Sequence, residues 1–340
     1  MKKIFLLLFT LQTILSIFIK MPLAVELIIE GYEYEVYVPE LESPTMLVFD
    51  SYRNLYVARD SQNSQEKLRI YKINSDLNVE LIGPEIQDPD SIAIDTEIND
   101  TLYIGGNTNG VYSILTDGTS SVDIELGNIN ITGLAIDFLN TFSDPRSLYI
   151  AIGGTSTKQI LKHNGRDFVD FELDLELKDP HALTFVDDKK YLLVASENVV
   201  YQILSDGRTE SFVEFDNFVE CIAYNKKDQN LYIGIISENS ISDNKIYKVS
   251  LNAEKSIFAK DIKAYGIFID DEDIFVSDRS EVPHRILKIS KNATQCYTED
   301  QVYTMISKIL AWGDINKDNK IGLEEAIRAL IIASGIKDNQ

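Results

Sequence analysis

The sequence predicts a mainly β fold, a six-bladed β-propeller, followed by a small α-helical module in which a loop joins two helices. Three observations carry this prediction: a unit of short apolar strands that recurs six times, an N-terminal strand that supplies what the sixth unit lacks, and a change to helical periodicity after Asn292. A repeat of about 40–45 residues with four strands is typical of propeller blades, because a single four-stranded sheet cannot bury both of its faces alone.

The chain begins with a segment typical of export. Lys2 and Lys3 precede the apolar run IFLLLFTLQTILSIFI, and this order of a basic and an apolar region predicts a signal peptide over residues 1–24. An uncleaved membrane anchor is the alternative, although a spanning helix usually needs about 20 apolar residues. Nothing later in the sequence resembles a membrane span. We therefore expect a secreted, periplasmic or cell-surface protein.

The propeller is predicted over residues 25–294 by the first strands of its six units. These strands begin at residues 46, 91, 133, 182, 221 and 266, so successive units start 39 to 49 residues apart. After a polar turn each is followed by a second strand, such as NLYVARD or NLYIGII, then a third, such as KIYKVS, and in most units a fourth. Runs of Val, Ile, Leu, Tyr and Phe between turn residues are the signature of strands.

The sixth unit, which ends with RILKIS, has no fourth strand of its own. The N-terminal stretch YEVYVPELESPTMLVFD parallels VELIGPEIQDPDSIAID, which joins the outer strand of one unit to the first strand of the next. We therefore expect residues 34–38 to complete the sixth blade beside residues 286–289. This pairing would unite both ends of the propeller in one sheet and remove an open edge.

The repeated pattern Pro-x-small-apolar-Ala-apolar-Asp, then a turn and Leu-Tyr-Val/Ile-Ala/Gly, resembles the NHL-repeat and SMP-30/gluconolactonase-like six-bladed propellers. The resemblance covers roughly three quarters of the chain and implies architecture more than activity. Asp residues recur after the first strands, where we expect them to hydrogen-bond the backbone of their own turns. They are Asp50, Asp95, Asp137 and Asp270.

Alignment of the six units places one residue of each at the mouth of the central channel. These ring residues are Thr45, Asp90, Thr132, His181, Glu220 and Tyr265. Asp90, His181 and Glu220 are the candidate catalytic residues, because carboxyl and imidazole groups bind metals and transfer protons. The lactonase branch of the resemblance implies a set of Glu, Asn and Asp around a divalent ion, and this ring contains no Asn. A polar mouth that is simply filled with water is the alternative.

The last segment, residues 295–340, predicts a calcium-binding helix–loop–helix. TEDQ, from Thr298 to Gln301, has the form of a capping box, and DINKDNKIGLEE separates the two helical patterns in the manner of an EF-hand. Asp314, Asn316 and Asp318 supply side-chain oxygens, Lys320 its backbone carbonyl, and Glu325 both carboxylate oxygens. Ligands that offer only oxygen select calcium over zinc or copper. The segment also resembles a single dockerin-type calcium repeat, whereas dockerins carry two such loops.

The charge and the cysteine content of the chain narrow the range of possible functions. The 54 acidic residues against 32 basic ones give a net charge of −22, which disfavours nucleic-acid binding. Two cysteines, Cys221 and Cys296, make no disulfide framework, and we expect Cys221 to be a small buried side chain. Two functions stay open: an exported calcium-binding interaction module whose partner is an extracellular protein or a carbohydrate, and a lactonase- or esterase-type hydrolase working at the channel mouth.

Overall fold

The computed structural model describes residues 25–292, apart from 62–65, 116–117, 140–141, 143–146, 155–158, 164–166 and 238–239. The chain divides into a unit of residues 1–292 and one of residues 293–340. The predicted signal peptide, the calcium loop and Cys296 all lie outside the described residues, so these remain predictions. Among the described residues, no helix has the length and apolar character to cross a membrane.

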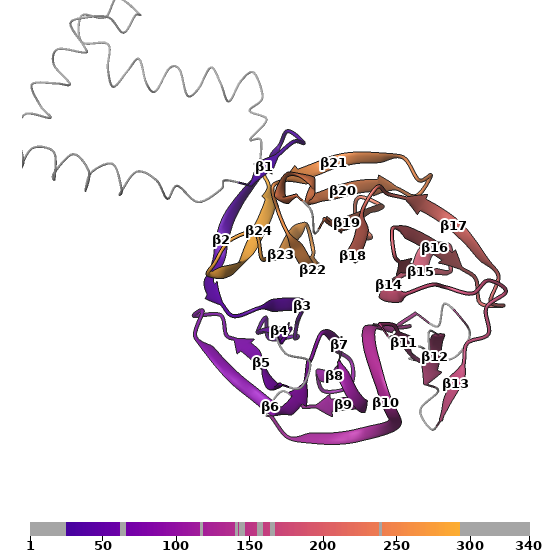
Figure 1. Cartoon of the computed structure of the whole chain (residues 1–340). Coiled ribbons are helices and arrows are strands. Elements are labelled where there is room, and N and C mark those ends of the chain that lie inside the picture. Colours follow the sequence, from indigo (N-terminus) through magenta and orange to yellow (C-terminus); the bar gives the residue numbers. More distant parts are fainter. Residues whose placement is uncertain are drawn as a thin grey trace, which may run out of the picture. The chain divides into compact units, whose positions relative to one another are not determined.

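Six four-stranded blades surround a central channel (Figure 1), as the repeats predict. The first blade contains β3 (Pro44–Phe49), β4 (Leu55–Arg59), β5 (Lys67–Ile73) and β6 (Val79–Gln87). The second contains β7 (Ser91–Asp95), β8 (Thr101–Gly105), β9 (Asn107–Ile114) and the start of β10 (Ser120–Ile136). The third contains the end of β10, then β11 (Leu148–Ile152), β12 (Gln159–His163) and β13 (Phe168–Asp170).

The fourth blade contains β14 (Pro180–Val186), β15 (Tyr191–Ser196), β16 (Val199–Ile203) and β17 (Thr209–Glu214). The fifth contains β18 (Phe218–Asn225), β19 (Asn230–Ile236), β20 (Lys245–Ser250) and β21 (Lys255–Lys260). The sixth contains β22 (Ala264–Asp270), β23 (Asp273–Asp278), β24 (His284–Lys291) and β2 (Tyr32–Leu41). Short 3₁₀ turns occur at Asp187–Lys189 and Ile241–Asp243.

The N-terminal strand closes the ring in the predicted register. In the sixth blade β2 runs antiparallel to β24, with Tyr34 opposite Ile289 and Val38 opposite Ile286. Val38 and Leu41 are buried against the first and sixth blades, together with Leu47, Phe275 and Ile286. Because strands from the two ends of the propeller share one sheet, opening the ring would expose both this apolar cluster and a free strand edge.

Two features of the sheets go beyond the sequence prediction. The fourth strand of the second unit (SVDIEL) and the first strand of the third (GLAID) were expected to be separate. They belong to the single strand β10, which pairs with β9 and then with β11. In addition, the short strand β1 (Glu26–Leu27) pairs with β21 and gives the fifth blade a fifth strand. Both ends of the described N-terminal segment are therefore tied to the blades, β1 to the fifth and β2 to the sixth.

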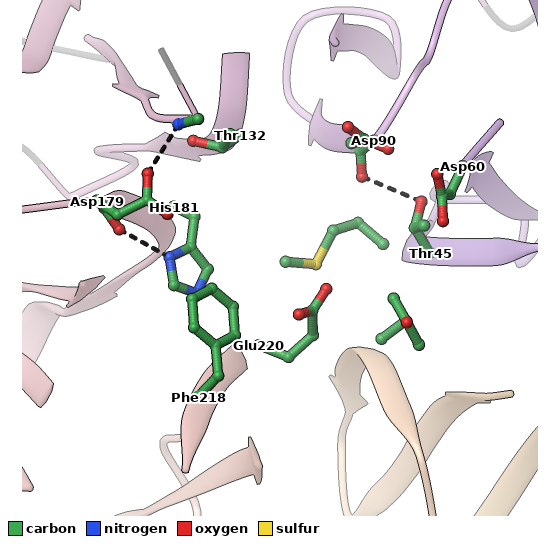
Figure 2. Close-up of a pocket in the computed structure, with 11 residues that line it drawn as sticks. Thr45, Asp60, Asp90, Thr132, Asp179, His181, Phe218 and Glu220 are labelled. Carbon is green, nitrogen blue, oxygen red and sulfur yellow. Dashed lines mark hydrogen bonds between the residues drawn. The ribbon is translucent and has the colours of Figure 1, made fainter. Parts of the chain in front are cut away.

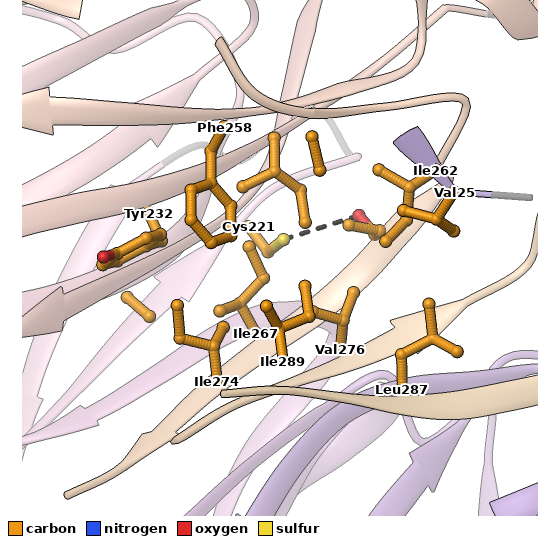
Figure 3. Packing of buried hydrophobic residues seen from close by; sticks show 14 residues of the cluster. Val25, Cys221, Tyr232, Phe258, Ile262, Ile267, Ile274, Val276, Leu287 and Ile289 are labelled. Carbon is orange, nitrogen blue, oxygen red and sulfur yellow. Dashed lines mark hydrogen bonds between the residues drawn. The ribbon is translucent and has the colours of Figure 1, made fainter. Parts of the chain in front are cut away.

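Apolar side chains between neighbouring blades form the core. Between the fifth and sixth blades they gather around Cys221, Phe258, Ile267 and Val276 (Figure 3). Cys221 is fully buried, as expected, and its thiol lies 3.4 Å from the Ala264 carbonyl oxygen. Burial raises the pKa of this thiol well above its usual range, so Cys221 behaves as a small apolar side chain.

The Asp residues after the first strands stabilise turns, as predicted, in three blades. Asp50 Oδ1 accepts hydrogen bonds from the backbone N–H groups of Tyr52 (2.9 Å) and Asn54 (2.7 Å). Asp95 and Asp137 accept similar bonds within their own turns. Asp270 differs: it forms an ion pair with Arg53 of the first blade at 2.5 Å. Its turn to β23 is only two residues long and offers no loop to cap.

A hydrogen bond near the channel links each blade to the next, all the way around the ring. Thr45 Oγ1 donates to the Asp90 carbonyl (3.0 Å), Ser91 Oγ to that of Ile131 (3.1 Å) and Thr132 Oγ1 to that of Pro180 (2.8 Å). The other three links are His181 Nε2 with Val219 O, Cys221 Sγ with Ala264 O, and Ser277 Oγ with Thr45 O. The ring fixes the relative positions of the inner strands, and therefore of the side chains that enter the channel.

Candidate functional site

A pocket of about 260 Å³ opens at the end of the channel where the first strands begin (Figure 2). All six predicted ring residues line it, which shows that the repeats were aligned in the correct register. Its other lining residues are Met46, Asp60, Gly154, Asp179 and Phe218. Four carboxyl groups therefore line the pocket, those of Asp60, Asp90, Asp179 and Glu220, and none of its lining residues is Lys or Arg.

A further carboxyl group, that of Asp88, lies close to those of Asp60 and Asp90.

Three of the ring residues are held in place by the blade-to-blade hydrogen bonds. The hydroxyl groups of Thr45 and Thr132 donate to backbone carbonyls, which fixes their orientation. Both ring nitrogens of His181 face carbonyl oxygens, Nδ1 that of Asp179 at 3.0 Å and Nε2 that of Val219. His181 also stacks on Phe218 with ring centroids 4.5 Å apart, and burial lowers its pKa. Neither nitrogen is left to bind a metal or a substrate, so the structure gives His181 a structural position within the predicted site.

Asp90 and Glu220 are placed differently from the other ring residues. Neither carboxyl group makes a hydrogen bond or an ion pair with another described residue, and both face the pocket (Figure 2). Burial raises the pKa of Glu220 from 4.5 to about 7, against the opposing effect of Arg279. Burial also raises the pKa of Asp90 well above its usual range, and the nearby charges of Asp88 and Asp60 add to this effect. Carboxyl groups with raised pKa values in a pocket are typical of sites for proton transfer.

Two acidic residues that the alignment of ring positions did not select complete an acidic triad. Carboxylate oxygens of Asp60, Asp88 and Asp90 all lie within 4.8 Å of one another. Asp60 follows β4 and Asp88 follows β6, so the triad forms where the first blade meets the start of the second. Asp88 is held by hydrogen bonds to its Oδ1 from the N–H (2.8 Å) and hydroxyl (3.0 Å) of Ser61.

Basic residues balance the triad from the sixth-blade side. Arg279, directly after β23, forms an ion pair with Asp60 at 2.6 Å and lies over the ring of Tyr265, 3.9 Å from its centroid. Lys263, directly before β22, lies over the same ring at 5.3 Å. The acidic triad therefore lies toward the first and second blades, and the two cations lie toward the sixth.

Part of this site could have been recognised from further signals in the sequence. The stretch QDPD places Asp88 two residues before the ring residue Asp90, and ARD places Asp60 at the end of the neighbouring second strand. Both are acidic residues that directly follow strands of the first unit. No comparable signal marks Lys263 or Arg279, since their relation to Tyr265 depends on how the loops of the sixth blade fold.

Comparison with solved structures agrees with the fold. A putative gluconolactonase matches with a TM-score of 0.59 at 9% identity, covering 78% of this chain and 94% of that one. A gluconolactonase from Xanthomonas campestris gives 0.59 at 9% identity, covering 77% and 90%. Virginiamycin B lyase from Staphylococcus aureus gives 0.51 at 15% identity, covering 76% and 99%. At these identities the likeness establishes the six-bladed propeller alone. No protein-family model and no curated protein matches the sequence.

Proposed function

We propose that this protein is a hydrolase of the lactonase or esterase type whose active site is the pocket at the channel mouth. The observation that carries the proposal is the pair of carboxyl groups of Asp90 and Glu220, which face one pocket without a hydrogen-bond partner among the described residues. Burying carboxyl groups without hydrogen-bond partners lowers the stability of the fold, so their presence in this pocket favours a functional role. Their raised pKa values suit proton transfer. The likeness to structures of gluconolactonases and a lyase agrees with an enzymatic use of the pocket.

Glu220 is the proposed general base. In its ionised form it takes a proton from a water molecule whose oxygen attacks the acyl carbon of the ester. The bond between that carbon and the alkoxy oxygen then breaks, and Glu220 returns the proton to the departing oxygen, which yields a carboxylic acid and an alcohol. Asp90, whose raised pKa favours its protonated form, donates a hydrogen bond to the carbonyl oxygen as negative charge develops there.

The acidic triad fits a divalent cation. Its donors are hard carboxylate oxygens within 4.8 Å of one another, and a cation would relieve the repulsion among them. Both carboxylate oxygens of Asp90 are without a hydrogen-bond partner among the described residues, while Asp60 also forms an ion pair with Arg279. Asp60, Asp88 and Asp90 would hold the ion in place of the proton on Asp90, and the bound ion would then supply the Lewis acid that polarises the ester carbonyl.

Hydrolysis of a panel of lactones and p-nitrophenyl esters by the full chain tests this function. We expect Glu220→Gln and Asp90→Ala each to lower kcat/KM by at least about 100-fold, the usual scale for loss of a proton-transfer group or of an oxyanion hydrogen-bond donor. Glu210→Gln, which removes an exposed carboxyl group on β17, is the control and should keep the wild-type rate. Chelator followed by added Mg²⁺ or Ca²⁺ tests the triad in the same assay. Equal rates for wild type and both pocket variants across the panel would contradict the proposal.

The calcium-binding interaction module stays a second proposal, favoured by the spacing of the tail loop. Asp314, Asn316, Asp318 and Glu325, with the Lys320 carbonyl, match the positions of EF-hand ligands. In this proposal the protein is exported by its N-terminal segment, the loop is filled by extracellular calcium, and the propeller presents a surface to a protein or a carbohydrate. The two proposals are compatible, since one concerns the tail and the other the channel mouth.

A further inference from the structure

A second cavity adjoins the proposed active site. It has a volume of about 400 Å³ and lies between the fifth and sixth blades. Its lining residues are Asn217, Phe218, Glu220, Ile236, Ser237, Lys263 and Tyr265. Phe218, Glu220 and Tyr265 line both cavities, so Glu220 stands at the boundary between them. A molecule bound at Glu220 can therefore extend into this second cavity, which we call the Lys263 compartment.

Lys263 gives the compartment its charge. It is the one basic residue among the lining residues that the structure describes, and its side chain is partly buried. Its ammonium group lies over the Tyr265 ring but forms no ion pair with Glu220 or with any other described residue. By contrast, Arg279, which also lies over the Tyr265 ring, forms an ion pair with Asp60 that neutralises its charge. Lys263 therefore offers a positive charge inside the cavity of a chain whose net charge is −22.

The other polar groups of the compartment suit an anion as well. The Asn217 side chain offers an amide N–H₂ group and makes no hydrogen bond to another described residue. Ile236, Phe218 and the Tyr265 ring supply apolar walls, which strengthen an ion pair formed beside them. One ammonium group and one amide match a single negative charge. A phosphate dianion would be repelled by the carboxyl groups of the adjoining pocket, and we therefore favour a carboxylate.

We propose that the Lys263 compartment binds a carboxylate group of the substrate while the ester or lactone carbonyl of the same molecule lies at Glu220. This inference rests on the proposed hydrolase function and adds a substrate class to it: small esters or lactones that carry a free carboxylate. The ammonium group of Lys263 would attract the carboxylate of such molecules toward a site whose surroundings are acidic. Lys263 is a specificity-determining residue in this scheme, and Glu220 performs the proton transfer.

The test compares the rates at which the full chain hydrolyses two esters of nearly equal shape. One is the mono-p-nitrophenyl ester of glutaric acid, which carries a carboxylate, and the other is the neutral p-nitrophenyl pentanoate. We expect the wild type to favour the anionic ester by about 10- to 100-fold in kcat/KM, the scale of a hydrogen bond to a charged group. Lys263→Met should remove most of this preference and Lys263→Arg should retain it, whereas Lys67→Met, on an exposed residue of β5, should leave the preference unchanged.

A binding measurement separates this inference from the proposed function. Glutarate should raise the thermal unfolding midpoint of the wild type at millimolar concentration, while the neutral 1,5-pentanediol should not, and Lys263→Met should abolish the glutarate effect. If neither ester is hydrolysed but glutarate still binds through Lys263, the compartment is supported and the hydrolase proposal fails. If both esters are hydrolysed with a preference that Lys263→Met does not change, the hydrolase proposal stands and the compartment is overturned.

Discussion

The raised pKa of Glu220 makes a direct prediction about stability. Burial raises it from 4.5 to about 7 in the folded protein, so between these values the folded state binds more protons than the unfolded state. Stability therefore falls as pH rises through this range. A difference of about 2.5 pKa units corresponds to about 3 kcal/mol at 1.36 kcal/mol per unit, and this cost is fully expressed above pH 7. Below pH 4.5 both states hold the proton and the cost disappears.

Glu220→Gln removes this titration while keeping the size of the side chain. The variant should exceed the wild type in unfolding free energy by about 3 kcal/mol at pH 8 and by less than about 1 kcal/mol at pH 5. Urea unfolding at several pH values, with a chelator present so that no cation offsets the charge, measures the difference. Glu210→Gln should track the wild type at every pH, because that side chain is exposed. A difference between wild type and Glu220→Gln that does not grow with pH would refute the argument, since the buried charge would then carry no cost.

Three further predictions concern the ring, the channel and the tail. Leu41→Ala, at a buried position of the closing strand β2, should lower the unfolding free energy by about 2–5 kcal/mol in urea titrations. Val36→Ala, at an exposed position of the same strand, should change it by less than about 1 kcal/mol. Gly133→Ala should lower the thermal midpoint, because a Cβ there would lie 1.6 Å from the His181 carbonyl oxygen and force the third and fourth blades apart. Calorimetric titration of the full chain should detect calcium binding that Glu325→Gln weakens and Glu220→Gln does not, and equal binding by the Glu325 variant would contradict the tail loop.

The sequence was most informative where periodicity applies. Strand residues alternate between two faces, so one correct alignment of the repeats places the same position of every blade at the channel. This is why Thr45, Asp90 and Tyr265, from three different blades, line one pocket. The closing strand was predictable for a related reason, because the connection from an outer strand to the next first strand repeats in the sequence.

Loops carry no such period, and the features that sequence reasoning missed lie in them. Asp60 and Asp88 approach Asp90 from connections between strands, and this approach depends on how those connections fold. Lys263 and Arg279 come together over Tyr265 for the same reason. For His181 the predicted position at the channel mouth is correct, but the predicted catalytic role is not supported. Both ring nitrogens face backbone carbonyl oxygens, and such contacts cannot be read from a sequence.

The blade-to-blade hydrogen bonds explain why Asp90 and Glu220 are the ring residues with uncommitted side chains. In the first, third and fourth blades the ring residue itself makes the link to the next blade, through Thr45, Thr132 and His181. In the second and fifth blades the residue that follows makes it instead, through Ser91 and Cys221. Shifting the link by one residue keeps the ring intact and releases the ring position to carry a carboxyl group into the channel. The fold thus separates the residues that hold the blades together from those that face the pocket, and both carboxyl groups of the proposed active site occur where this shift occurs.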